Sequence, residues 1–143
     1  MPDHIGRLRT ARIARLSTLD GEGHPNVLPV CFVVDGDRTI YTAVDGKPKK
    51  AAPDQLARVR NIRRHGRVAL VVDHYEEDWR QLWYVLVRGV AALIPGEPAE
   101  ERARSLTLLR EKYPQYRAGL LADEAPIIRI SIERITGWES KAG

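Results

Sequence analysis

The spacing of apolar and polar residues predicts six strands and three helices along the chain. Alternating or β-branched runs that end at turn residues are typical of strands; they cover residues 13–19, 26–34, 39–44, 68–72, 83–94 and 128–133. Apolar residues three or four apart indicate amphipathic helices, at residues 1–12, 53–64 and 99–113. In the last strand, Ile128, Ile130 and Ile132 alternate with polar residues. The run Val68–Val72 is apolar throughout, which predicts a strand buried on both faces.

Turn and breaker residues indicate how the strands are connected. Turn sequences at residues 20–23 and 35–37 join the first three strands, which predicts an antiparallel meander. Pro29 lies inside the second strand and has no N–H to donate. This strand is therefore expected at a sheet edge or a bulge, where a ligand can approach its backbone. Gly89 lies inside the fifth strand and predicts a bulge that bends the sheet.

The order of the elements favours a mainly β fold of the α+β class. Strands do not alternate regularly with helices, which disfavours a doubly wound parallel sheet. We therefore expect a six-stranded antiparallel barrel with two or three peripheral helices. With 143 residues and 43% hydrophobic content, one domain over residues 1–143 is expected. No apolar run approaches the roughly 20 residues of a membrane span, and no signal-peptide block is present, so we expect a soluble cytoplasmic protein without a membrane partner.

Positive charge is concentrated in one segment. The chain has 23 lysine and arginine residues against 19 acidic ones, a net charge of +4, and most of the excess lies between Lys47 and Arg67. A strand end that delivers Lys47, Lys49 and Lys50 to the start of a helix suits a phosphate group. The residues alone leave three interpretations open: a solvated helix face, a nucleic-acid surface, or the site of a phosphorylated cofactor such as a flavin. Aromatic residues do not interleave with these cations, which disfavours nucleic acid.

The usual catalytic and metal-binding motifs are missing from the sequence. The four histidines are scattered singly, and no serine nucleophile elbow or glycine-rich nucleotide motif is present. Cys31 is the only cysteine, which excludes an internal disulfide and a multi-cysteine metal site. Because no cation neighbours it in sequence, Cys31 is interpreted as a small core residue rather than a nucleophile. We therefore expect no metal and no catalytic side chain.

Four segments carry a resemblance to a known family. They are, in chain order, IYTAVDGKPKK, RNIRRHGRVALVVDHYEEDW, REKYPQY and ITGW. With them, nearly the whole chain resembles the pyridoxamine 5'-phosphate oxidase-like split β-barrel superfamily, an FMN-binding-protein-like fold. Within that superfamily the chain most resembles the group described as probable coenzyme F-420-dependent enzymes. The resemblance implies a homodimer with a flavin or deazaflavin in each groove at the interface.

The function that the resemblance implies is that of an oxidoreductase. Such an enzyme would transfer hydride between coenzyme F-420 and a small organic substrate, with FMN as the alternative cofactor and no nucleic-acid partner. Because the cofactor carries the hydride chemistry, the missing catalytic motifs are expected. A protein that binds the cofactor without turnover and a nucleic-acid binder are the alternatives of a different class.

The resemblance also implies which residues contact the cofactor. The second strand supplies backbone contacts to the ring edge, a Tyr-Thr pair on the third strand lies by the ring, and cations on the next loop hold the phosphate. Arginines of the following helix suit the glutamate tail of coenzyme F-420, and a residue near the carboxyl end reaches the site from the partner subunit. The expected cofactor-binding residues are Leu28, Pro29, Val30, Cys31, Tyr41, Thr42, Ala43, Lys47, Lys49, Lys50, Arg60, Asn61 and Trp138.

Overall fold

A computed structural model describes residues 3–47 and 56–140 of the 143-residue chain. The helices are α1 (His4–Thr10), α2 (Ala57–Arg64) and α3 (Glu100–Lys112), with short helical turns η2 (Trp79–Gln81) and η3 (Tyr116–Leu120). The strands are β1 (Ala14–Leu19), β2 (Pro25–Val30), β3 (Val33–Asp35), β4 (Thr39–Ala43), β5 (Arg67–His74), β6 (Trp83–Leu93) and β7 (Ile127–Glu139). None of the helices in these described ranges is long and apolar enough to cross a membrane.

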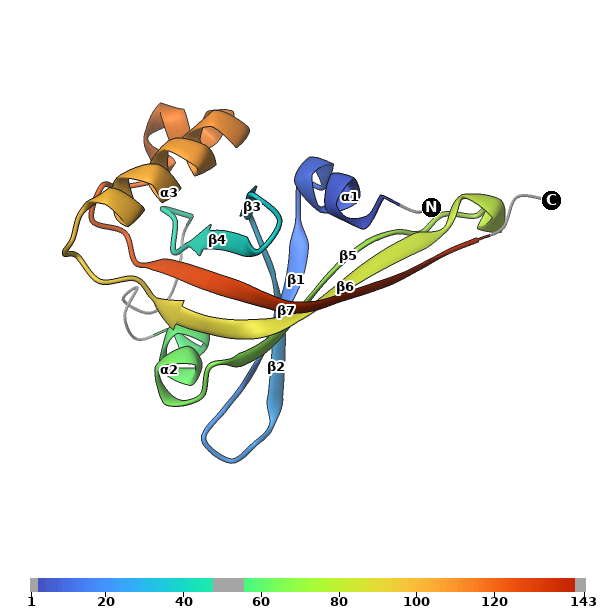
Figure 1. Ribbon diagram of the computed structural model, residues 1–143, viewed down its shortest axis with the longest axis horizontal. Helices are drawn as coiled ribbons and strands as arrows, with labels where there is room; N and C mark the ends of the chain where they lie inside the picture. Colours follow the sequence, from blue (N-terminus) through green and yellow to red (C-terminus); the bar gives the residue numbers. More distant parts are fainter. Residues whose placement is uncertain (1–2, 48–55, 141–143) are drawn as a thin grey trace.

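Within the described residues, seven strands form one curled sheet in the order β2-β1-β5-β6-β7-β4-β3. Each neighbouring pair is antiparallel. α3 packs against β3 and β4, and α2 packs against β1 and β6; the two helices lie on opposite sides of the sheet in Figure 1. The expected mainly β class with peripheral helices is confirmed, with seven strands where six were expected.

The additional strand arises because the predicted strand at residues 26–34 is two strands, which lie at opposite edges of the sheet. β2 pairs with β1 at one edge, and β3 pairs with β4 at the other. The chain therefore crosses between the edges at Cys31 and Phe32, and the predicted meander is wrong at this point. Since one continuous backbone joins both edges, the sheet curls into a split barrel. The edge position expected from Pro29 is confirmed.

A buried tyrosine explains why the ladder stops at this crossover. The Tyr113 hydroxyl accepts a hydrogen bond from the Phe32 N–H at 2.9 Å. It also lies 2.9 Å from the Phe32 carbonyl and 3.0 Å from the Arg12 carbonyl, and it can donate to either. The Thr42 hydroxyl donates to the Cys31 carbonyl at 2.6 Å. Side chains thus satisfy backbone groups that a strand ladder would otherwise pair.

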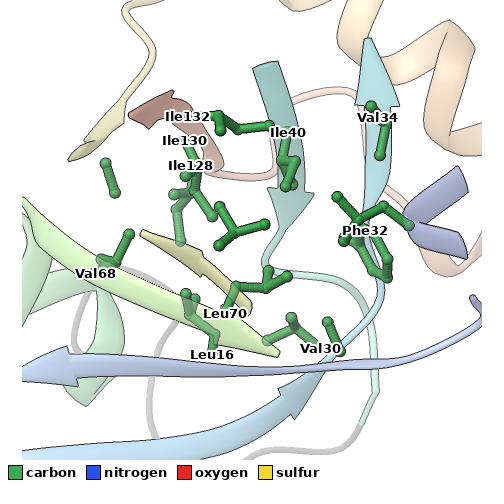
Figure 2. Packing of buried hydrophobic residues seen from close by; sticks show 14 of the residues in the cluster. Leu16, Val30, Phe32, Val34, Ile40, Val68, Leu70, Ile128, Ile130 and Ile132 are labelled. Carbon is green, nitrogen blue, oxygen red and sulfur yellow. The ribbon is translucent and has the colours of Figure 1, made fainter. Parts of the chain in front are cut away.

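The interior of the curled sheet holds the main hydrophobic core. Figure 2 shows how side chains from both edges of the sheet converge with those of the central strands, including Leu16, Val30, Ile40 and Ile130. Phe32 at the crossover is fully buried in this cluster. A second cluster joins α3 to β3 and β4. The crossover therefore ties the two sheet edges together through the core.

β5 is buried on one face only. Val68, Leu70 and Val72 point into the core, whereas Ala69 and Val71 are half-buried on the other face. The prediction of burial on both faces is wrong, because a curled sheet has one interior and alternate residues face away from it. Gly89 does mark the predicted bulge, since the register of β6 and β7 shifts between Arg88 and Gly89.

β7 and α3 differ from their predictions in extent or orientation. β7 continues to Glu139, through residues expected to form a tail, because β6 extends beside it and pairs as far as Trp83 with Glu139. Ala99 and Ala103 belong to the apolar spacing that predicted a helix at residues 99–113, but both are exposed. The buried residues of α3 are Ser105, Leu106 and Leu109. The predicted start of α2 at Pro53–Asp54 lies outside the described residues.

Candidate functional site

A cavity of about 280 Å³ opens where the end of β2, the end of β4 and α2 come together. We call it the β2–β4 groove. Its lining residues come from segments that are distant in sequence but adjacent in the curled sheet. They are Ile13, Pro29, Val30, Cys31, Ala43, Asp45, Lys47 and Arg58.

One wall of the groove is apolar and follows from the edge position of β2. Because β2 pairs with β1 on one side, its backbone groups on the other side have no neighbouring strand in the described sheet. Pro29 and Ile13 are exposed here, and Ala43 at the end of β4 is small, which leaves space against the sheet. A planar ring with polar edges can lie against such a surface.

The other wall is charged and centres on Asp45, which is buried. Its carboxylate accepts a hydrogen bond from the Tyr116 hydroxyl at 2.6 Å and forms an ion pair with the Lys47 ammonium. Burial raises the pKa of Asp45, but the hydrogen bonds from Lys47 and Tyr116 outweigh burial and hold the pKa at about 2. Asp45 is therefore ionised at neutral pH and fixes Lys47 beside the groove.

We expect acid to destabilise the fold partly through Asp45. Its pKa of about 2 in the folded protein lies below the ordinary value of 3.8, so the carboxylate stabilises the fold above about pH 4. That contribution is lost as the pH falls from about 4 to about 2. Thermal melts at pH 5 and pH 3 should show a larger fall in Tm for the wild type than for Asp45→Asn. The exposed control Asp123→Asn should follow the wild type, and equal falls for the wild type and Asp45→Asn would contradict the assignment.

Arg58 places a second cation in the groove. It stands in the first turn of α2 and is half-buried. Its Nε atom is buried and has no hydrogen-bond partner among the described residues. Burial lowers the pKa of Arg58, while the nearby Asp45 and Tyr116 act in the opposite direction. Because an unsatisfied buried N–H group is costly, this position suits an anion bound in the groove.

A second cavity of about 250 Å³ meets the groove at Cys31 and Lys47, which line both. We call it the tyrosine pocket. Its two buried tyrosine rings have centroids 5.2 Å apart, and the Arg12 guanidinium lies 4.8 Å from the Tyr113 ring centroid. The lining residues are Arg12, Cys31, Lys47, Tyr113, Gln115, Tyr116 and Leu120.

Five of the residues expected to bind the cofactor come together in the β2–β4 groove. They are Pro29, Val30, Cys31, Ala43 and Lys47. Cys31 packs against the second core cluster, as its interpretation as a core residue expects, but it is only half-buried and also lines both cavities. A cation does adjoin its thiol in space, since the Lys47 Nζ lies 3.7 Å from the sulfur.

Other expected residues on β2 and β4 do not line the groove. Leu28 packs against the core. The Tyr41 hydroxyl donates to Glu101 on α3 at 2.9 Å, and the Thr42 hydroxyl donates to the Cys31 carbonyl at 2.6 Å. Tyr41 and Thr42 therefore do not line the groove, and the Thr42 hydroxyl instead holds the backbone of Cys31, which does.

The remaining expected residues lie elsewhere or outside the described ranges. Arg60 is exposed on α2, and the buried Asn61 donates to the Thr18 hydroxyl at 3.0 Å. Trp138 stacks on Tyr84 near the end of β7, with ring centroids 6.2 Å apart, and does not line either cavity of its own chain. Lys49 and Lys50 lie outside the described residues.

Eight of the residues that line the groove or the pocket were not on the expected list, and three of them form or adjoin the charged wall: Asp45, Arg58 and Tyr116. Asp45 lies in the IYTAVDGKPKK segment and Tyr116 in the REKYPQY segment, but neither was assigned a role. Arg58 was one of several similar arginines on a predicted helix. The run Asp45-Gly46-Lys47 was a usable signal, because two opposite charges two residues apart at a strand end can pair. Nothing in the sequence distinguishes Arg58 from Arg60 without the helix orientation.

The described residues contain no group of three or more histidine, cysteine or acidic side chains that could hold a metal ion. The groove and the pocket instead combine apolar walls with three cationic side chains, Arg12, Lys47 and Arg58. Asp45 is the one acidic residue among the described residues that line them. The site is therefore suited to an organic anion.

Solved structures with the same fold come from several bacteria. A conserved hypothetical protein of Mycobacterium tuberculosis has a TM-score of 0.74 and 19% identity over 97% of this chain and 85% of that one. A FAD-binding protein of Mesorhizobium loti has a TM-score of 0.65 and 21% identity over 93% and 87%. A heme storage protein of Vibrio cholerae has a TM-score of 0.69 and 15% identity over 93% and 88%. At these identities the likeness shows the fold alone.

The sequence comparison is more specific. No curated protein sequence matches the chain significantly. The sequence model of the pyridoxamine 5'-phosphate oxidase family, however, matches residues 2–139, nearly the whole chain. Together with the split barrel described above, this match shows that the chain belongs to the pyridoxamine 5'-phosphate oxidase family.

Proposed function

We propose that this protein is a coenzyme F-420-dependent oxidoreductase that transfers hydride between the deazaflavin and a small organic substrate. The observation that carries the proposal is Arg58, whose buried Nε has no partner among the described residues and which lines the β2–β4 groove. A cofactor phosphate would satisfy this group with a charge-assisted hydrogen bond. Lys47, on the same charged wall, would supply a second cation.

The apolar wall of the groove fits the ring system of such a cofactor. Val30, Cys31 and Ala43 offer apolar surface, and the free edge of β2 offers backbone groups to the polar edge of a flavin or deazaflavin ring. The cofactor supplies the hydride chemistry when bound. The residues of the chain bind it, orient its ring against β2 and hold positive charge near its phosphate.

The choice of coenzyme F-420 over FMN rests on the arginines of α2. Arg60, Arg63 and Arg64 are exposed on the helix that carries Arg58. They extend the positive charge beyond the groove, as the acidic glutamate tail of coenzyme F-420 would require. FMN, which ends at its phosphate, is the alternative and needs only the groove itself.

A protein that binds a cofactor without turnover is the second candidate. The same fold occurs in a heme storage protein. Heme iron usually takes an axial histidine, cysteine, methionine or tyrosine ligand, and the described walls of the groove contain Cys31 but no histidine. Titration with hemin beside the flavins therefore distinguishes storage of heme from binding of a flavin or deazaflavin.

We include a homodimer in the proposal, because a second copy of the chain could bury the exposed apolar residues beside the groove. Ile13 and Val27 are exposed at the β1–β2 edge, and Trp138 is exposed at the far end of the sheet. Within one chain Trp138 stacks on Tyr84, away from the groove. A second copy would bury such surface, and Trp138 of the partner subunit would then be available to the cofactor site. Light scattering of the purified chain should give the mass of a dimer.

Turnover tests the proposal against a binding protein. Reduced coenzyme F-420 should be oxidised in the presence of the protein and a panel of conjugated acceptors, faster than without protein. Binding of coenzyme F-420 without any turnover over the panel would favour the non-catalytic candidate. Binding of FMN alone, with turnover of reduced FMN, would favour the flavin alternative.

Replacement of Lys47 by alanine should weaken cofactor binding by about 10-fold, which corresponds to about 1.4 kcal/mol. The expected loss is modest because the Lys47 ammonium also pairs with Asp45. Burial lowers the pKa of Lys47, but the Asp45 hydrogen bond and neighbouring charges raise it overall, so the side chain is cationic at neutral pH. Cofactor fluorescence titration measures the effect. Unchanged affinity would remove Lys47 from the phosphate site.

A further inference from the structure

The tyrosine pocket adjoins the β2–β4 groove but is lined mostly by different residues. Cys31 and Lys47 belong to both cavities, whereas Arg12, Tyr113, Tyr116 and Leu120 line only the pocket. A molecule in the pocket would therefore be next to whatever fills the groove. This position is the one a substrate needs to meet the ring of a bound cofactor.

Two buried tyrosine rings form part of the pocket wall. Tyr113 and Tyr116 are both buried, and their rings are tilted by 54° with centroids 5.2 Å apart. Their hydroxyls are used within the protein, Tyr113 at the Phe32 backbone and Tyr116 at Asp45. The two tyrosines therefore present ring surface rather than hydroxyl groups to the pocket. Aromatic faces favour a planar ligand.

The charge at the pocket is positive. Burial raises the pKa of both tyrosines, that of Tyr113 to about 12, so both are neutral. Arg12 is exposed at one side, where one guanidinium nitrogen donates to the Lys112 carbonyl at 2.8 Å. Since a guanidinium carries five N–H donors, one hydrogen bond to the Lys112 carbonyl does not use all the donors of Arg12. No acidic residue lines the pocket among the described residues.

The volume of the pocket limits the size of its ligand. At about 250 Å³, it lies below the roughly 300–1,000 Å³ of sites that take drug-sized molecules. A single ring fits this space. The pocket therefore has room for a small ring compound beside a molecule that lies in the groove.

We propose that the tyrosine pocket is a substrate subsite for a planar, single-ring organic anion, whose carboxylate is held by Arg12. That the bound anion is a substrate rests on the proposed function. Binding of the anion in the pocket does not depend on the cofactor. Arg12 acts in it as a specificity-determining residue. The arginine fork matches a carboxylate in two parallel hydrogen bonds, which a neutral analogue cannot reproduce.

Three probe compounds test the class of ligand. Sodium benzoate, benzamide and cyclohexanecarboxylate are titrated into the purified full chain, with and without cofactor, and followed by ligand-observed NMR. Benzoate should bind at least about 10-fold tighter than benzamide, which has no negative charge. It should also bind tighter than cyclohexanecarboxylate, whose ring is not planar. Equal binding of the three compounds, or no binding of benzoate, would overturn the proposal.

Two variants locate the binding in the pocket. Arg12→Gln should weaken benzoate about 10-fold and leave benzamide unchanged, whereas Arg9→Gln on α1 outside the pocket should change neither. Leu120→Trp should fill the pocket and remove benzoate binding while cofactor affinity stays the same. Benzoate binding that survives both Arg12→Gln and Leu120→Trp, or that the cofactor displaces, would overturn the subsite. Failure of the cofactor to bind the wild type would instead refute the proposed function. Benzoate titration of the cofactor-free chain would still test whether the pocket binds the anion.

Discussion

Replacement of Arg58 by alanine is expected to weaken cofactor binding by about 10- to 150-fold, or about 1.5–3 kcal/mol. This residue should matter more than Lys47, because its buried Nε has no other partner among the described residues. Removal of the guanidinium leaves the phosphate without its charge-assisted hydrogen bond. Fluorescence titration of the variant with coenzyme F-420 and with FMN measures the loss.

Two further variants separate this role from general charge. Arg58→Lys keeps the positive charge but not the fork of donors, so its affinity should lie between those of the wild type and Arg58→Ala. Arg63→Ala removes an exposed arginine from the same helix, and it should leave FMN affinity close to that of the wild type. An Arg58→Ala protein that is folded and binds the cofactor as tightly as Arg63→Ala would exclude Arg58 from the phosphate site.

Replacement of Phe32 by alanine is expected to cost about 3–5 kcal/mol of unfolding free energy. Phe32 is fully buried in the main core cluster, at the point where the chain crosses between the sheet edges. Its ring also contacts the Lys112 ammonium, which lies 4.0 Å from the ring centroid. A cavity here would loosen the packing between both edges and the interior. Urea denaturation at pH 7 measures the change.

The control for Phe32 is an aromatic residue outside the core. Tyr75 is 64% exposed, and Tyr75→Ala should change stability by less than about 0.5 kcal/mol. Phe32→Leu, which keeps most of the buried volume, should lose about 1–1.5 kcal/mol and provides a folded variant if Phe32→Ala does not fold. A loss below about 1 kcal/mol for Phe32→Ala would show that the crossover does not depend on this side chain.

Periodicity predicted the elements well where the contacts that decide them are local. The alternation at residues 128–133 and the glycine inside 83–94 correctly predicted a strand and its bulge. The crossover at Cys31–Phe32 could not be predicted, because it depends on the Tyr113 hydroxyl, which is distant in sequence. The length of β7 likewise depends on its partner β6 rather than on its own pattern.

The candidate site was predicted in part for a similar reason. Pro29 and Lys47 carry local signals, a missing N–H in a strand and a cation at a strand end, and both line the groove. Asp45 also carried a local signal, its opposite charge two residues before Lys47, whereas Arg58 becomes recognisable only when the end of β4 and the first turn of α2 are placed together. Tyr41 illustrates the opposite case, since its hydroxyl turns toward Glu101 on α3. The direction of a side chain depends on packing that sequence spacing does not report.

The most direct test of the central claim is a pair of fluorescence titrations of the purified apo protein, one with coenzyme F-420 and one with FMN. We predict that coenzyme F-420 binds with the higher affinity, because it offers Arg58 a phosphate and the exposed α2 arginines a glutamate tail. Tighter binding of FMN would support the alternative cofactor in the same groove. Binding of neither compound would contradict the account, and the β2–β4 groove would not be a flavin or deazaflavin site.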